Sequence, residues 1–256
     1  MLLYKGGFTQ MEEKVYSLNL DGYTLRYSFL VPKTRRIFGN YLTECNDTEY
    51  DIRLSRDFME EFRWLVTEDT ADEYLEYHAL MIATARFLLP ADRTLIHGVS
   101  FLWKDMAWLI TAPSGSGKTT QLKNWQEIVG DDMTVINGDK PVISCRDEGI
   151  VYMSSSPWMG KEWYGNCNIS AKLGGIILLE QGDHNEIKRL CSKDAVLPLF
   201  LELLSYPDNT DQIHMMGRLL GRILEHTPVW KLTNLGNLDS TELTKETILK
   251  YVEAPR

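Results

Sequence analysis

The sequence predicts an α/β protein with a mixed sheet, preceded by a smaller α+β region. Short apolar runs of strand length alternate with longer stretches that carry apolar residues at helical spacing. One strand-like run, residues 107–110, enters a loop of small residues that opens an amphipathic helix. The pattern changes near residue 93, so we expect two regions, 1–93 and 94–256.

In the first region the patterns predict strands and one helix. Residues 14–20 and 23–31 are β-rich runs joined by Asp21-Gly22, which is a hairpin signal, and residues 50–54 alternate like another short strand. Residues 72–89 carry Met, Tyr and Leu at helical spacing and stop at Pro90. The apolar face of that helix is typical of core packing.

In the second region the order of elements favours a mixed sheet flanked by helices over a strict βαβ array. The expected strands lie at 95–102, 106–111, 134–136, 141–145, 150–153, 174–179 and 229–232. The expected helices lie at 118–129, 195–205, 211–225 and 241–252.

Composition excludes several classes of function. With 44% hydrophobic and 25% charged residues among 256, the chain is an ordinary globular one. We expect no membrane segment, because no apolar run of about 18 residues is present. We expect no signal peptide, because residues 1–11 lack a long apolar core and a small-residue cleavage site. The four cysteines lack Cys-x-x-Cys spacing, which disfavours a zinc site and favours a reducing cytoplasm. A net charge of -9 repels nucleic acid and anionic lipid, so any phosphate contact is expected to be local.

The loop at 112–119 predicts phosphate binding. Small residues let successive backbone N–H groups turn toward a phosphate at the start of a helix, although Ala112 stands where the first glycine is usual. Lys118 is expected to reach the β- and γ-phosphates, and the Thr119 hydroxyl to complete the shell of a Mg²⁺ ion. The alternative is an ordinary glycine-rich turn. The predicted nucleotide-binding residues are Ser114, Gly115, Ser116, Gly117, Lys118, Thr119 and Thr120.

A phosphoryl-transfer site also needs an acidic group at the end of a neighbouring strand. Asp139 is in that position, directly after the strand expected at 134–136, and we predict that it holds metal and accepts a proton. The alternative pair, Asp131 and Asp132, precedes the strand and is more typical of a solvated turn.

Taken together, His97-Gly98, the loop ending in Gly117-Lys118-Thr119, and Asn137-Gly138-Asp139 resemble the HPr kinase/phosphorylase family. The similarity covers about residues 95–179 and extends to the phosphoenolpyruvate carboxykinase-like nucleotide-binding fold. It implies ATP and Mg²⁺ as cofactors, Asp139 as general base and His97 near the γ-phosphate. The family has an aspartate where this chain has Gly138, which puts the reverse phosphorolysis reaction in doubt.

Pro157-Trp158-Met159-Gly160 resembles segments on the substrate side of the nucleotide in carboxykinase-like proteins. Lys161 follows and is a candidate to neutralise charge on the transferred group, the alternative being a surface turn beside a packed Trp. Arginines expected on later helices are candidates for a phosphate clamp or for solvated helix faces, and three tryptophans are candidates for adenine stacking or for core. These residues are Arg189, Arg218 and Arg222, and Trp103, Trp108 and Trp125.

The leading hypothesis is an ATP-dependent kinase that phosphorylates a hydroxyl, and the resemblance implies a serine of a small protein or peptide. Residues 1–93 are a candidate for binding the acceptor, and a homo-oligomer is possible. The alternatives are a nucleotide-binding regulator without turnover and a small-molecule kinase or carboxykinase-like enzyme.

Overall fold

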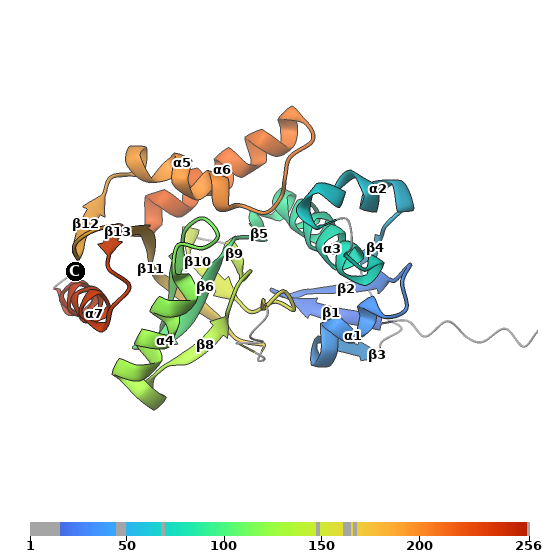
Figure 1. The fold of residues 1–256 in the computed structure, drawn as a ribbon. Helices are drawn as coiled ribbons and strands as arrows, with labels where there is room; N and C mark the ends of the chain where they lie inside the picture. The colour runs from blue at the N-terminus through green and yellow to red at the C-terminus, as the bar shows by residue number, and fades with distance from the viewer. Residues whose placement is uncertain are drawn as a thin grey trace, which may run out of the picture.

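A computed structural model describes residues 16–44, 50–67, 70–146, 149–160, 165 and 168–254. It contains two sheets, one in each region of the chain, and helices that cover them (Figure 1). None of the helices in these residues combines the length and apolarity that crossing a membrane requires.

The first sheet has four strands in the order β3-β1-β2-β4. The Asp21-Gly22 turn forms the predicted hairpin, with both residues at positive φ and Leu20 opposite Tyr23. The long helix α3 (Asp72–Leu88) packs on this sheet through a buried face that includes Leu75, Ala79 and Leu80. The other elements are β1 (Tyr16–Leu20), β2 (Tyr23–Ser28), α1 (Thr34–Phe38), β3 (Leu42–Glu44), β4 (Tyr50–Arg53) and α2 (Arg56–Glu61).

The second sheet has nine strands and both parallel and antiparallel pairs. The path β5-β9-β10-β11-β7-β6-β8 branches at β11, which also pairs with β13, and β13 pairs in turn with β12. The strands are β5 (Arg93–Leu95), β6 (Gly98–Trp103), β7 (Met106–Thr111), β8 (Thr134–Asn137), β9 (Val142–Cys145), β10 (Val151–Ser154), β11 (Ser170–Gln181), β12 (Glu186–Leu190) and β13 (Val229–Asn234).

Strand direction in the second sheet gathers the carboxyl ends of four strands at one edge. β7 and β8 are both antiparallel to β6, so they run parallel to each other on its two sides. Their carboxyl ends therefore lie at the edge where β6 begins, with Gly98 opposite Thr111 and Ser100 opposite Asn137. β11 and β13 are parallel to β7 and end at the same edge. Ligands of α/β sheets commonly bind at such carboxyl edges.

Helices cover both faces of the second sheet (Figure 1). α4 (Lys118–Val129) and α7 (Leu238–Val252) pack together on one face, where Leu122, Trp125 and Ile248 are fully buried. α5 (Ser192–Glu202) and α6 (Thr210–His226) pack together on the other. The result is a three-layer arrangement of helices, mixed sheet and helices.

Several details of the prediction are wrong. The described part of the first region contains three α-helices, α1, α2 and α3, where the patterns predict one. The strand expected at 95–102 is two strands, β5 and β6, because Ile96 and His97 between them hydrogen-bond to the carbonyl groups of Pro141 and Glu202. Arg189 lies on strand β12 and not on a helix. Its guanidinium lies over the rings of Trp230 and Tyr251.

One apolar core joins the two regions of the chain. It contains side chains of the first sheet and of α3 together with Leu95, Val142 and Trp158 from the second region. Trp158 is fully buried, and its indole N–H donates to the Tyr77 carbonyl of α3 at 3.0 Å. The first region therefore packs directly against the segment that follows β10.

Candidate functional site

The glycine-rich loop connects the end of β7 to the start of α4, as the motif predicts. Gly115 and Gly117 have φ values of 81° and 96°, a backbone conformation that residues with a side chain rarely adopt. The Gln181 amide at the end of β11 donates to the Gly115 carbonyl at 3.3 Å and ties the loop to the neighbouring strand. Ser114, Gly115 and Thr120 are exposed, and Ser116, Gly117 and Thr119 are half-buried. The loop therefore presents its backbone and its hydroxyl groups at the edge of the sheet.

Lys118 is the buried residue of this motif. Its side chain is 8% exposed, and the ammonium donates to the carbonyl oxygens of Ala112 and Pro113 at 2.7 and 3.1 Å. An ammonium has three N–H donors, so one remains for a ligand. The side chain thus reaches back across the glycine-rich loop to its first residues.

Asp139 follows β8 and is held by a polar turn. The Asn137 side-chain oxygen accepts from the backbone N–H groups of Asp139 and Lys140 at 2.8 and 2.7 Å. The amide of Asn137 in turn donates to the Ser156 carbonyl at 2.9 Å. This arrangement fixes the backbone at Asp139, whose side chain is 23% exposed and receives a hydrogen bond from the Lys140 ammonium.

His97 lies beside Asp139 at the start of β6. Its Nε2 is 3.7 Å from a carboxylate oxygen of Asp139, and the next residue, Gly98, donates its N–H to the Asp139 carbonyl at 2.8 Å. A Cβ atom at Gly98 would lie 2.8 Å from the Ile110 carbonyl oxygen, so only glycine permits this approach of β6 to β7. The His-Gly pair therefore brings the imidazole to the acid.

Glu202, at the end of α5, is a site residue that the sequence analysis missed. Its carboxylate lies 2.8 Å from Nδ1 of His97, and its backbone carbonyl accepts from the His97 N–H, also at 2.8 Å. The side chain is 8% exposed. Glu202, His97 and Asp139 thus form a continuous row across the edge of the sheet.

The charges of Glu202, Asp139 and Lys140 lie near enough to Lys118 to shift its pKa. Burial, the largest cause, lowers the pKa of Lys118 below its usual value, and the positive charge of Lys140 lowers it further. The negative charges of Glu202 and Asp139 act in the opposite direction and raise it. Lys118 therefore interacts electrostatically with Glu202 and Asp139.

Helix α3 of the first region contributes Tyr77 and His78 to the surroundings of the acid. Burial raises the pKa of Tyr77 well above its usual value, and the charge of Asp139 adds to this effect. Burial lowers the pKa of His78 to about 4; the nearby Lys140 lowers it too, while Asp139 opposes the shift. Neither residue carries a sequence signal that distinguishes it from the core-facing residues of the same helix.

An apolar groove of about 630 Å³ borders the loop. Its lining includes Ser116 and Gln181 as well as Glu202. Leu197 and Leu201 of α5 form part of its wall and are 63% and 70% exposed. The groove therefore borders both the loop and Glu202.

The remaining candidate residues have other environments. Lys161 lies outside the described residues. Asp131 and Asp132 lie in an exposed turn after α4. Arg218 and Arg222 of α6 both bind Asp92, which is an ion-pair role and not that of a phosphate clamp. The three tryptophans proposed for adenine stacking are core residues, namely Trp103, Trp108 and Trp125.

A Mg²⁺ ion was predicted on Thr119 and Asp139. Among the described residues, no group of three or more His, Cys, Asp or Glu side chains is arranged to hold a metal. The donor set nevertheless fits Mg²⁺, because this ion is commonly bound by one or two protein oxygens, substrate phosphates and water.

Comparisons with known proteins give a fold-level likeness. The sequence matches no protein-family model, and no curated protein matches it. Among solved structures, the fold is similar to the Hpr(Ser) kinase/phosphatase from Coxiella burnetii, at 12% identity and a TM-score of 0.36. That match covers 61% of this chain and 97% of the other.

Proposed function

We propose that this protein is an ATP-dependent kinase that transfers the γ-phosphoryl group to a hydroxyl, most specifically a serine of a small protein or peptide. The observation that carries the proposal is that the loop with Lys118 follows β7 and Asp139 follows β8, because the carboxyl ends of these two strands lie at the same edge of the sheet. A phosphate-binding loop with an acid across from its lysine provides the positioning and charge stabilisation that phosphoryl transfer needs.

Each residue has a role in this proposal. The loop N–H groups and Lys118 bind the β- and γ-phosphates. Asp139 accepts the proton of the acceptor hydroxyl as that oxygen attacks phosphorus and the bond to the ADP oxygen breaks. His97, held by Glu202, stabilises charge at the transferred group. Lys161 is a further candidate for that charge stabilisation.

Mg²⁺ would be held by Thr119 and Asp139, and it would supply neutralisation of phosphate charge when bound. The hydrogen bond from Lys140 to Asp139 must then be shared or released. The ammonium of Lys140 would remain close enough to face the terminal phosphate.

The apolar groove beside the loop supports a peptide acceptor. Its exposed leucines lie on the same helix, α5, as Glu202, which also lines the groove and contacts His97. A peptide with apolar side chains beside its serine would bury these leucines and bring its hydroxyl to the acid.

A nucleotide-binding regulator without turnover is the second candidate. It is favoured by the Lys140 ammonium, which occupies an oxygen of Asp139, and by Gly138, which replaces a family aspartate. Both candidates require nucleotide binding, so only turnover separates them.

The test measures ATP affinity and ADP formation for the full chain with Mg²⁺. Lys118→Ala should weaken ATP binding by about 100-fold, because it removes charged contacts to two phosphates. The matched control Lys123→Ala, on the exposed side of the same helix, should bind as the parent does. Equal affinity in both variants would refute nucleotide binding at this loop, and binding without ADP formation for any peptide acceptor would favour the regulator.

A further inference from the structure

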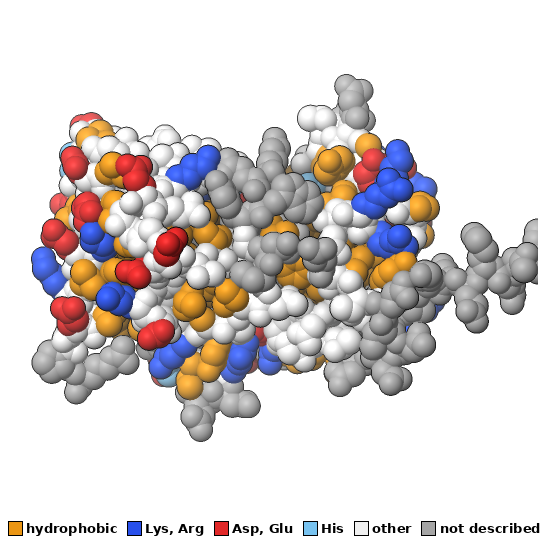
Figure 2. Space-filling model, turned by 90° about the horizontal axis from the view of Figure 1, so that it is seen from below, with side chains coloured by type: hydrophobic (Ala, Val, Ile, Leu, Met, Phe, Trp, Pro, Cys, Tyr) orange, Lys and Arg blue, Asp and Glu red, His pale blue; other side chains and the backbone are white. Residues whose placement is uncertain are grey.

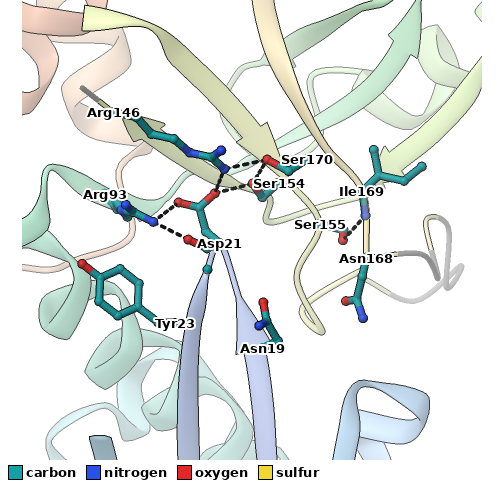
Figure 3. Close-up of a pocket in the computed structure, with 11 residues that line it drawn as sticks. Asn19, Asp21, Tyr23, Arg93, Arg146, Ser154, Ser155, Asn168, Ile169 and Ser170 are labelled. Carbon is teal, nitrogen blue, oxygen red and sulfur yellow. Dashed lines mark hydrogen bonds and ion pairs between the residues drawn. The ribbon is translucent and has the colours of Figure 1, made fainter. Parts of the chain in front are cut away.

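A polar cavity of about 560 Å³, separate from the apolar groove, lies where the first sheet meets the second (Figure 3). The tip of the β1–β2 hairpin enters it from one side, and the ends of β9, β10 and β11 form the other. It shares no lining residue with the groove beside the phosphate loop. Its lining consists of Asn19, Asp21, Gly22, Tyr23, Arg93, Arg146, Ser154, Ser155, Asn168, Ile169 and Ser170.

Two arginines in this cavity share one carboxylate. The Asp21 side chain is fully buried and accepts from Nη1 of Arg93 at 2.7 Å and from Nη2 of Arg146 at 2.5 Å. The hydroxyl of Ser154 also donates to it. Among the described lining residues, Arg93 and Arg146 carry two positive charges and Asp21 carries one negative charge. An excess of positive charge among the groups of a polar cavity attracts small anions.

The guanidinium groups are held in place by contacts that do not involve Asp21. Arg93 lies over the ring of Tyr23 at 4.7 Å, and Arg146 lies over the ring of Tyr152 at 4.0 Å. Arg146 also donates to the Ser170 hydroxyl at 2.6 Å. Both side chains would therefore keep their positions if the carboxylate were exchanged for another anion.

Each arginine also has an unused terminal nitrogen. The hydrogen bonds of the Arg93 side chain all use Nη1, and those of Arg146 all use Nη2. Within the described part of the chain, Nη2 of Arg93 and Nη1 of Arg146 have no acceptor, yet neither is among the buried atoms without a partner. These two donors are thus accessible, and the hydroxyl groups of Ser155 and Ser170 lie in the same lining.

We propose that this cavity is a binding site for a small phosphate-type anion, held by Arg93 and Arg146. Planar guanidinium groups bind the tetrahedral oxygens of phosphate by paired, charge-assisted hydrogen bonds. The Asp21 carboxylate is a competitor for these arginines, built into the hairpin tip. The cavity is larger than one inorganic phosphate, so the anion is either free phosphate or a phosphate monoester.

The test titrates inorganic phosphate, and separately glycerol 3-phosphate, into the full chain by calorimetry. Lys118→Ala is the background for all variants, because the glycine-rich loop is itself expected to bind phosphate. In this background Arg146→Gln should weaken binding at least tenfold, and Asp21→Asn should strengthen it by about tenfold, since the competing charge is gone. Arg53→Gln is the matched control, because Arg53 is an exposed arginine paired with Asp51 on β4, and it should bind like the background. Tighter binding of glycerol 3-phosphate than of phosphate would identify a monoester as the ligand.

Phosphate affinity is expected to fall in Arg146→Gln and to rise in Asp21→Asn, and these opposite changes distinguish a binding site from a structural ion pair. An ion pair that only joins the sheets would lose stability in both variants and show phosphate binding in neither. Should Asp21→Asn not fold by circular dichroism, Arg146→Lys decides, because it keeps the charge, loses the planar fork and should give intermediate affinity. Absence of phosphate binding in the background, or equal binding by Arg146→Gln and Arg53→Gln, would overturn the proposal. Neither result depends on whether the protein is a kinase.

Discussion

Glu202 holds His97 at two points. The His97 backbone N–H donates to the Glu202 carbonyl, and Nδ1 of the imidazole lies against the Glu202 carboxylate, both at 2.8 Å. With Nδ1 engaged in this way, the other ring nitrogen faces Asp139 at 3.7 Å. A buried carboxylate behind an imidazole fixes the orientation of the ring and its tautomer.

We predict that Glu202→Ala lowers the rate of ADP formation by about tenfold and leaves the affinity for ATP unchanged. The reason is that His97 loses the partner that orients it, while the glycine-rich loop is unchanged. Glu202→Gln should recover much of the rate, because its side-chain oxygen accepts from Nδ1–H. Glu225, an exposed glutamate near the end of α6, provides the control Glu225→Ala. A parental rate in Glu202→Ala would show that the contact is structural only.

Asp139→Asn is expected to keep ATP affinity within about threefold and to slow ADP formation by at least about 100-fold. The amide is nearly isosteric, so the turn built by Asn137 should persist, but it accepts no proton. Single-turnover rates with saturating ATP measure the effect. Asp131→Asn, in the exposed turn after α4, should retain the parental rate. Transfer at that rate by Asp139→Asn would remove this residue from the role of general base.

The local parts of the site could be predicted from the sequence. The loop, helix α4 and the placement of Asp139 after β8 all follow from contiguous patterns of strand, small residues and helix. Such patterns are visible because each lies within one short segment of the chain. The three-layer arrangement around the second sheet follows from the same periodicities.

The rest of the site depends on long-range packing. Glu202 is 105 residues from its partner His97, and only the packing of α5 on the sheet brings the two together. Tyr77 and His78 reach the acid because one core joins α3 to the second region. Strand β12 was missed for a different reason: its residues are mostly charged and half-exposed, so they lack the apolar alternation of a strand.

On its face seen in Figure 2, the second region shows acidic and basic side chains interspersed among uncharged and hydrophobic surface. The charges that the proposed chemistry uses, those of Lys118, Asp139 and Glu202, instead act on one another locally.

His78 should make stability depend on pH between about 4 and 6.5. Its pKa is lowered to about 4, chiefly by burial, so the unfolded chain binds a proton in this window and the folded protein does not. Stability is then fully present above about 6.5 and is lost as the pH falls toward 4, by about 2–3 kcal/mol. Thermal melts from pH 7 to 4 should show a shallower decline in His78→Gln, whose side chain does not titrate. His214→Gln on α6 is the comparison, and an identical slope in parent and His78→Gln would contradict the assignment.

Gly160 lies directly against the side chain of Asp139, the proposed general base. It has a φ of 77°, and a Cβ atom there would lie 3.0 Å from Cβ of Asp139 and 3.3 Å from its carboxylate carbon. Gly160→Ala should therefore displace the carboxylate and add backbone strain, with a loss of about 1–2 kcal/mol in unfolding free energy. The rate of ADP formation should fall more than the stability does, because a displacement of about 1 Å is enough to lower a transfer rate 100-fold. Gly236→Ala, also at positive φ but with open space around it, carries the strain without the collision. Similar rates in the two variants would mean that the approach of Gly160 does not position Asp139.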